Sequence, residues 1–166
     1  MSYNDTTHNP NWVCWNLNKD DIGNATRGAT HFDQRCASCH ALGGRGHAVG
    51  PDLGPFRAKP TADFLTAILD PNAAVEPRFT AWMVELKGGR VMMGVIGDES
   101  TSAFTLAQPG GTTERVAKAE ITRFTPVPTS LMPVGLEDGM SPQDFADLIA
   151  WIRSAPPAAG APASTP

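Results

Sequence analysis

The chain has 166 residues and a formal net charge of −4 at pH 7, so its electrostatics do not favour nucleic acid or an anionic membrane surface as a partner. This length corresponds to one domain, or to one domain with an insertion. No apolar run reaches the roughly 18 residues that a membrane span needs. The 16 Gly and 15 Pro residues indicate many turns.

The N-terminal region predicts an irregular arm followed by a helix. Residues 1–20 show no period, and we expect an arm packed on the surface. They lack the apolar core of a secretory signal peptide. Residues 24–35 predict a helix, because Ala25, Gly28 and Phe32 fall on one face.

The helix leads into Cys36-Ala37-Ser38-Cys39-His40, a CxxCH motif with the spacing for covalent attachment of a c-type haem. On a helical turn, Cys36 and Cys39 lie on one side, where each can form a thioether with one vinyl group of the haem. His40 is then placed to ligate the iron. The motif predicts one covalently bound haem c.

Two other interpretations of the cysteines remain open. A zinc site would need two more ligands, and the chain offers only unpaired candidates. A thioredoxin-like pair would need a strand before Cys36, where the sequence predicts a helix. The unpaired candidates for zinc are His8, Cys14, His31 and His47.

The segment after the motif predicts a loop and a short helix. Residues 41–60 are rich in Gly and Pro, and residues 61–69 predict a helix with Thr61 as the candidate N-cap. Arg57 and Lys59 at the end of the loop are candidates to pair with haem propionates. The alternative is that both are solvated surface charges.

The middle of the chain predicts strands. Segments 79–87 and 90–98 flank Gly88-Gly89, which is typical of a hairpin with a two-residue turn. Segments 102–108 and 113–121 predict further strands, so we expect an antiparallel sheet of three or four strands. Its apolar side chains would pack on the haem-bearing part, on a second subunit or on a docking partner.

The C-terminal region returns to loop and helix. Residues 126–140 predict a Pro-rich loop. Residues 142–153 predict a helix that begins with a capping box of Ser141 and Asp144. The tail, residues 156–166, is of low complexity and predicts disorder.

The order of helix, CxxCH, loop, helix, Met-containing loop and final helix resembles the class I cytochrome c fold. Gly28 and Phe32 match the glycine and the aromatic residue of its first helix. Leu148 and Trp151 match the pair that they cross on its last helix. The resemblance implies a mainly α fold, a class I cytochrome c helical core with a small antiparallel β-sheet inserted before the Met loop.

The expected divisions are an arm (1–20), a cytochrome c domain (21–155) with the insertion at about 79–121, and a tail (156–166).

The loop Gly50-Pro51-Asp52-Leu53 matches the Gly-Pro-x-Leu loop of the same family. The resemblance implies that the Pro51 carbonyl accepts a hydrogen bond from His40, which fixes the tautomer of the imidazole. It also implies that Leu53 packs on the haem.

A narrower resemblance covers about residues 25–153. The strings ILDPNAAV (68–75), GGRVMMGVI (88–96) and SLMPVGL (130–136) are similar to the planctomycete/verrucomicrobial-type haem-binding domain. That family is a cytochrome c variant often found at the C-terminus of large exported proteins. The resemblance implies haem binding and little about partners.

Several side chains are candidates for the second axial ligand of the iron. Met132 lies in a Pro-flanked loop just before the last helix, where class I cytochromes carry their distal Met, and a rigid loop suits a weak Fe–S bond. His47 and an open position are the alternatives. The remaining candidates, for which core packing or a surface role is the simpler explanation, are His31, Met83, Met92, Met93 and Met140.

These residues predict a monohaem cytochrome that carries single electrons between redox proteins and is not an enzyme. Covalent haem attachment normally takes place outside the cytoplasm, so we expect a periplasmic or otherwise exported protein whose leader is absent from this chain. Cys14 would there be an odd cysteine, either a buried thiol or the link of a homodimer. The alternative functions are a five-coordinate haem sensor or peroxidase-like module, with Arg123 as a polar group near the iron, and a haem-bearing docking module of a larger complex.

Overall fold

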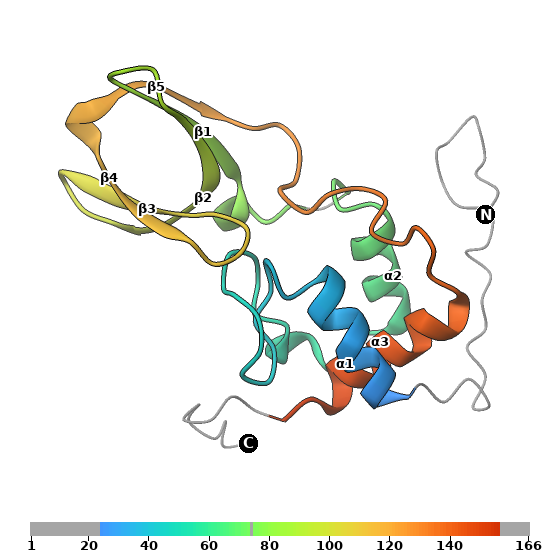
Figure 1. Cartoon of the computed structure of the whole chain (residues 1–166). Helices are drawn as coiled ribbons and strands as arrows, with labels where there is room; N and C mark the ends of the chain where they lie inside the picture. The colour runs from blue at the N-terminus through green and yellow to red at the C-terminus, as the bar shows by residue number, and fades with distance from the viewer. Residues whose placement is uncertain (1–23, 74, 157–166) are drawn as a thin grey trace, which may run out of the picture.

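The computed structural model of the protein describes residues 24–73 and 75–156. Three helices lie together in one part of the molecule, and five strands form a sheet in the other (Figure 1). The elements are α1 (Ala25–Arg35), α2 (Thr61–Leu69), β1 (Ala81–Leu86), β2 (Val91–Glu99), β3 (Ala103–Ala107), β4 (Thr113–Ala117), β5 (Ile121–Pro126) and α3 (Pro142–Ser154).

The prediction of a mainly α fold is wrong. The structure is 32% helical and 25% strand, and its sheet has five strands where three or four were expected. Helices and sheet also have separate hydrophobic clusters. The sheet is therefore a second structural unit of comparable size, and the fold is one of helices and sheet together.

The helical cluster forms where α1 crosses α3. Gly28 makes the close approach possible, because a Cβ built on it would lie 1.9 Å from the Asp147 carbonyl oxygen and 2.7 Å from Trp151 Cβ. Phe32 is fully buried beside this crossing, and Leu148 is 2% exposed. The predicted crossing of Gly28 and Phe32 with the last helix is confirmed.

Local capping fixes where the helices begin. The Asn24 side chain caps α1 by accepting hydrogen bonds from the backbone nitrogens of Thr26 and Arg27. The predicted capping box of Ser141 and Asp144 begins α3. Thr61 was expected to cap α2, but it is the first residue inside that helix.

The strands of the sheet lie in the order β4-β3-β2-β1-β5, all antiparallel. The predicted hairpin is present, but Leu86 N donates to the Arg90 carbonyl at 2.8 Å, so the loop has the three residues Lys87, Gly88 and Gly89 instead of two. The two glycines have φ of +89° and +85°, values that glycine adopts without steric cost. The predicted fourth strand ends at Ala117, because a 3₁₀ turn over Lys118–Glu120 interrupts it. The chain then forms β5, which pairs with β1.

The sheet is strongly curled (Figure 1), and its buried apolar side chains form one cluster. The rings of Phe104 on β3 and Phe124 on β5 lie 5.6 Å apart between centroids, although β2 and β1 separate the two strands in the sheet. Trp82, which is half-buried, stacks at 4.2 Å on Phe124, which is 40% exposed, so this aromatic pair is partly open to solvent. The buried residues of this cluster are Val84, Met92, Phe104, Leu106 and Val116.

Two expectations lie outside the described residues, the arm at 1–20 with Cys14 and the tail beyond residue 156. Within the described ranges, no helix has the length and the apolar character needed to cross a membrane.

Candidate functional site

The CxxCH segment continues α1 as one tight turn. Cys36 N donates to Phe32 O at 2.8 Å, and the Cys36 carbonyl accepts from Cys39 N at 3.0 Å and from His40 N at 2.8 Å. Both cysteines are free and half-buried. Residues 36–40 therefore form one hydrogen-bonded turn at the end of α1.

His40 is oriented by the proline loop. Its Nδ1 lies 2.8 Å from the Pro51 carbonyl oxygen, the contact that the family resemblance implied. Because a carbonyl oxygen can only accept, Nδ1 is the nitrogen that carries the proton, and Nε2 keeps its lone pair. An imidazole held in this tautomer can bind a metal through Nε2.

The surroundings of His40 favour its neutral form. Burial lowers the pKa of His40 below its ordinary value of 6.5, and the opposing effect of the Pro51 carbonyl is smaller. Gly50 packs against the ring, because a Cβ on this residue would lie 2.9 Å from His40 Cε1. The loop thus fits closely around the imidazole.

A cavity of about 470 Å³ opens beside His40. It brings together Cys39, His40, Pro51, Leu53 and Met132 of the predicted site residues, whereas Cys36 packs on the helical cluster and Arg57 lies elsewhere. The other lining residues are mostly apolar and include Val49, Phe56, Phe64, Ala67, Pro71, Ala73, Val75, Phe79, Val95 and Leu131. A large apolar cavity with one imidazole and one thioether on its wall fits a haem.

Met132 is held in place by hydrogen bonds around its loop. Ser130 N donates to Asn72 Oδ1 at 2.8 Å, which ties the loop to the segment after α2. Met132 N donates to Ser130 Oγ at 3.1 Å. The loop is therefore anchored just before Met132, which lines the cavity.

The other candidates for the second axial ligand have different places. Met92 and Met140 are buried in the sheet cluster and the helical cluster, and Met83 and Met93 are exposed on the sheet. His47 is exposed and does not line the cavity. His31 pairs with a carboxylate of α3, at 3.1 Å from Asp144 Oδ1.

Arg57 and Lys59 differ in their relation to the cavity. Lys59 lines it, with Nζ 3.7 Å from Asp63 Oδ2. Arg57 donates from Nη2 to the Pro156 carbonyl at 3.1 Å, and its Nε is buried with no hydrogen-bond partner in the described part of the chain. Lys59 is therefore the candidate cation on the cavity wall, whereas Arg57 reaches the Pro156 carbonyl and does not line the cavity.

The geometry disfavours the two other interpretations of the cysteines. Burial raises the pKa of Cys36 to about 11, an effect that the nearby Arg35 charge reduces only in part, whereas a redox-active CxxC needs a low-pKa thiol. For zinc, Cys36, Cys39 and His40 would have to converge. Among the described residues, they do not form a group of three ligand atoms within 4.8 Å.

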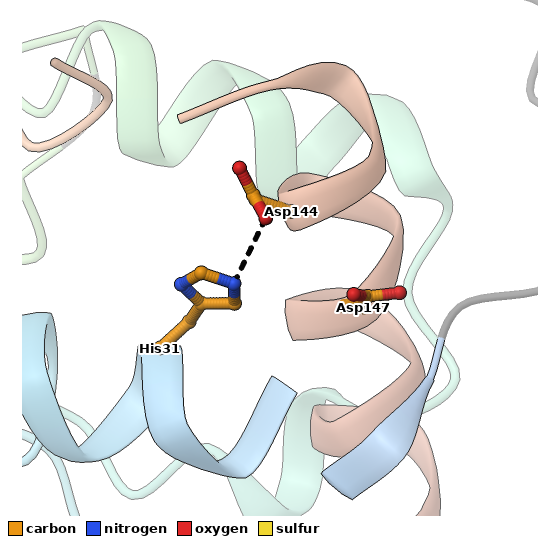
Figure 2. Close-up of side chains that lie close together, drawn as sticks. All are labelled: His31, Asp144 and Asp147. Carbon is orange, nitrogen blue, oxygen red and sulfur yellow. Dashed lines mark ion pairs between the residues drawn. The ribbon is translucent and has the colours of Figure 1, made fainter. Parts of the chain in front are cut away.

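One group of possible metal ligands lies at the helix crossing, formed by His31, Asp144 and Asp147 within 4.8 Å of one another. Figure 2 shows His31 paired with Asp144, while Asp147 lies further along α3. The Asp147 carboxylate is fully buried and accepts from Asn24 N at 2.6 Å and Arg27 Nε at 2.6 Å. Protein donors occupy both its oxygens, so this group braces α1 against α3.

The sequence did not identify the contribution of the inserted region to the cavity wall. Val75 and Phe79 precede β1, and Val95 lies on β2. Alternating apolar residues on the strand were the only signal, and they left open which surface the strand would contact. Arg123, a candidate distal group, lies 3.6 Å from Glu85 on the sheet and does not line the cavity.

Comparison with known proteins gives one family. The family model of cytochrome c matches residues 25–101, from the start of α1 to the connection between β2 and β3, and thus includes the CxxCH turn and the proline loop. A search of curated proteins found no match. The match covers less than half of the chain, and together with the geometry of His40 and its cavity it supports a haem-binding role like that of cytochrome c.

Proposed function

We propose that the protein is a monohaem c-type cytochrome that carries one electron at a time between redox proteins. The thioethers would form at Cys36 and Cys39, and the axial ligands would be His40 and Met132. The observation that carries this proposal is that His40, oriented by Pro51, and Met132 line the same apolar cavity. The haem supplies an iron that alternates between its ferric and ferrous states.

Rapid electron transfer requires ligands that keep their positions when the iron changes its oxidation state, and hydrogen bonds in this chain restrain both proposed ligands. The Pro51 carbonyl fixes the His40 ring, and the hydrogen bonds of Ser130 hold the Met132 loop. The surrounding apolar side chains, such as Leu53 and Phe64, exclude water from the cavity. A thioether ligand in a dry site stabilises ferric iron less than water does, and this raises the reduction potential.

We assign the two haem propionates to the side of the cavity that carries Lys59. The ammonium group of this residue is their proposed partner. The acidic residues that also line the cavity are Asp63, Asp70 and Glu76. Cationic partners offset the charge of buried carboxylates, which would otherwise be costly in an apolar site.

Met132 on the cavity wall favours an electron carrier over a five-coordinate sensor or peroxidase-like module. Such a module needs an open distal position with polar donors, and Arg123 pairs with Glu85 away from the cavity. Electron carriers dock through small and transient surfaces, so the partners we infer are redox proteins. Because covalent haem is attached outside the cytoplasm, we also propose that the protein is exported.

We further assign the domain to the planctomycete/verrucomicrobial type. The strings at 68–75, 88–96 and 130–136 support this assignment. The first string begins at the end of α2, the second covers the β1–β2 turn and most of β2, and the third contains Met132.

The first test concerns covalent attachment. Haem should stay with the parent protein in acidified organic solvent, and Cys36→Ala combined with Cys39→Ala should release it. Extraction of haem from the parent, or metal analysis that finds zinc and no iron, would contradict the proposal.

The second test concerns the axial methionine. Met132→Ala should abolish the sulfur-to-ferric-iron absorption band, lower the reduction potential and open the site to carbon monoxide or cyanide. Met140→Ala is the matched control, because Met140 is 5% exposed in the helical cluster and does not line the cavity. It should reduce stability and leave the spectrum unchanged. A parent-like low-spin spectrum in Met132→Ala would show that the sixth ligand lies elsewhere.

A further inference from the structure

The sheet meets the cavity through one face of β2. Val91, Met93 and Val95 alternate on this face, and their exposure falls from 56% at Val91 through 44% at Met93 to 6% at Val95. Val95 lines the cavity, and the two other residues do not. The strand therefore runs from solvent to the cavity and contributes one apolar side chain to its wall.

A second contact joins the sheet to the CxxCH backbone. Gly110, in the turn between β3 and β4, donates its N–H to the Ser38 carbonyl at 2.7 Å. The carbonyls on either side accept from the loop that follows the motif, Ala37 from His47 N at 3.0 Å and Cys39 from Gly50 N at 2.7 Å. The sheet thus supplies the donor to the middle one of three successive carbonyls of the turn.

The β3–β4 turn approaches the loop after the motif so closely that a side chain has no room. A Cβ built on Gly111 would lie 2.1 Å from His47 Nδ1. A Cβ on the neighbouring Gly110 would meet no atom within 4 Å. Both glycines have positive φ, +84° at Gly110 and +79° at Gly111, so they differ in contact and not in backbone conformation.

We propose that the five-stranded sheet is a part of the haem site and sets its reduction potential, through Val95 on the cavity wall and through the β3–β4 turn on the CxxCH backbone. This inference rests on the proposed function. In this proposal the sheet holds the CxxCH turn in position and keeps water away from the haem cavity.

The physical basis is the charge of the ferric state. An apolar wall near the iron stabilises that charge less than water or a polar group does, and it therefore favours the ferrous state. Val95 supplies such a wall, and the hydrogen bond from Gly110 keeps water off the Ser38 carbonyl. Loss of either contact should lower the potential.

The first experiment introduces a hydroxyl at Val95 without a change of size. In the haem-loaded protein, Val95→Thr should shift the midpoint potential to a lower value in a spectroelectrochemical titration. Val91→Thr adds the same hydroxyl on the exposed part of the same face. Val84→Thr adds it in the sheet cluster, where Val84 is fully buried away from the cavity. Both controls should keep the parent midpoint, although Val84→Thr should unfold at a lower denaturant concentration.

The second experiment separates the β3–β4 turn from the loop that follows the CxxCH motif. Gly111→Asn should push the turn away from His47, because asparagine tolerates positive φ but has a side chain where none fits. The expected results are faster amide hydrogen exchange at Gly110 and a lower midpoint potential. Gly88→Asn, at positive φ in the β1–β2 turn and likewise facing open space, should keep the parent potential.

A lower midpoint in Val95→Thr or in Gly111→Asn, with the controls unchanged, supports the proposal. A parent midpoint in both, or an equal shift in the controls, overturns it. In either of those cases, covalent haem and a His/Met spectrum would leave the proposed function intact. A parent protein without covalent haem would overturn the proposed function, and the role of the sheet with it.

Discussion

The helical part and the sheet differ in how their chain segments come together. The helical part joins segments from the two ends of the described chain, as when Asn24 N bonds to Asp147 Oδ1 across 123 positions. The sheet is built from strands that follow one another between residues 81 and 126. Local contacts cost less loop-closure entropy than distant ones. We therefore expect the sheet to form early and the helical part to close later.

The two parts also differ in how they contribute to the site. The helical part supplies the cysteines and the imidazole, on a turn that continues α1. The sheet supplies an apolar wall residue, Val95, and one backbone hydrogen bond, from Gly110. The helical part thus supplies the proposed haem-binding side chains, and the sheet supplies part of the cavity wall. Substitutions in the sheet should therefore change the polarity around the site and leave the proposed ligands in place.

The largest expected effect comes from truncating one buried side chain in either hydrophobic cluster. Leu106 is fully buried in the sheet cluster, and Leu106→Ala should cost about 3 kcal/mol through the lost burial and the cavity left behind. Hydrogen exchange followed by mass spectrometry should show faster exchange in β2 to β4 and unchanged protection of α1 and α3.

Leu148→Ala is the counterpart in the helical cluster, where Leu148 is 2% exposed. It should cost a similar amount and loosen α1 and α3 first. Equal loss of protection in both parts, in either variant, would show that the helices and the sheet unfold as one cooperative unit.

A smaller effect is expected at the helix crossing. Gly28→Ala should destabilise the protein by about 2 kcal/mol, because the new Cβ would overlap the Asp147 carbonyl oxygen. On an open helix surface, the same substitution stabilises by about 1 kcal/mol, so the sign is diagnostic. Urea denaturation measures the change. Thr30→Ala on the exposed side of α1 is the control, and a stabilising Gly28→Ala would disprove the close crossing.

Acid should weaken the helical part through Asp147. Burial by itself raises the pKa of Asp147, but the hydrogen bonds from Asn24, Arg27 and Gln143 outweigh it, so this pKa is lower in the folded state than its ordinary 3.8. A depressed carboxyl pKa adds stability above the ordinary value, and this stability is lost as the pH falls from there through the folded-state pKa.

Asp147→Asn tests this contribution, because it removes the titrating group and keeps its shape. At neutral pH it should cost about 1–3 kcal/mol, since donors that meet a carboxylate would meet a weaker acceptor. The difference in unfolding free energy between parent and variant should shrink as the pH falls below 3.8. A pH-independent difference would contradict the assignment.

The smallest expected effect lies at the start of α3. Ser141→Ala removes the side chain that accepts from Asp144 N and should cost about 1 kcal/mol in a thermal or urea melt. Ser154→Ala at the other end of the same helix is the control and should cost less than about 0.5 kcal/mol. Similar losses in both variants would argue against the capping box.

Local patterns in the sequence predicted the helices and the β1–β2 hairpin well, because each depends on residues close together in the chain. The first helix shows a helical period over residues 24–35, and the last helix begins with the capping pair Ser141 and Asp144. The hairpin is marked by its turn glycines, Gly88 and Gly89. The family resemblance added the link from His40 to Pro51, which the periodicity could not reveal. The residues proposed to bind the haem remain a prediction that the described experiments test.

The fifth strand was missed because it looks like the start of a loop. β5 alternates weakly, most of its residues are exposed, and it ends at Pro126 with Pro128 just beyond. It is an edge strand, paired on one side with β1, so a terminal proline costs no hydrogen bond within the sheet. With five strands instead of four, the sheet became too large for the mainly α assignment.

Contacts between distant segments were beyond the reach of sequence patterns. Nothing near Gly110 indicates that its N–H reaches Ser38, and nothing near Arg57 indicates that its guanidinium reaches the Pro156 carbonyl. Such contacts depend on how the sheet and the helices pack, which a local period does not encode.

The strand order has a consequence for how this protein arose. The chain enters the sheet on β1 and leaves it on β5, and these neighbours are joined at their ends by the hydrogen bond from Val127 N to Ala81 O at 2.8 Å. Entry and exit therefore coincide in space. A gene segment for such a unit can be gained, lost or exchanged in evolution without rerouting the rest of the chain. Residues 81 and 127 are accordingly the graft points for transplanting the sheet into another protein of the same type.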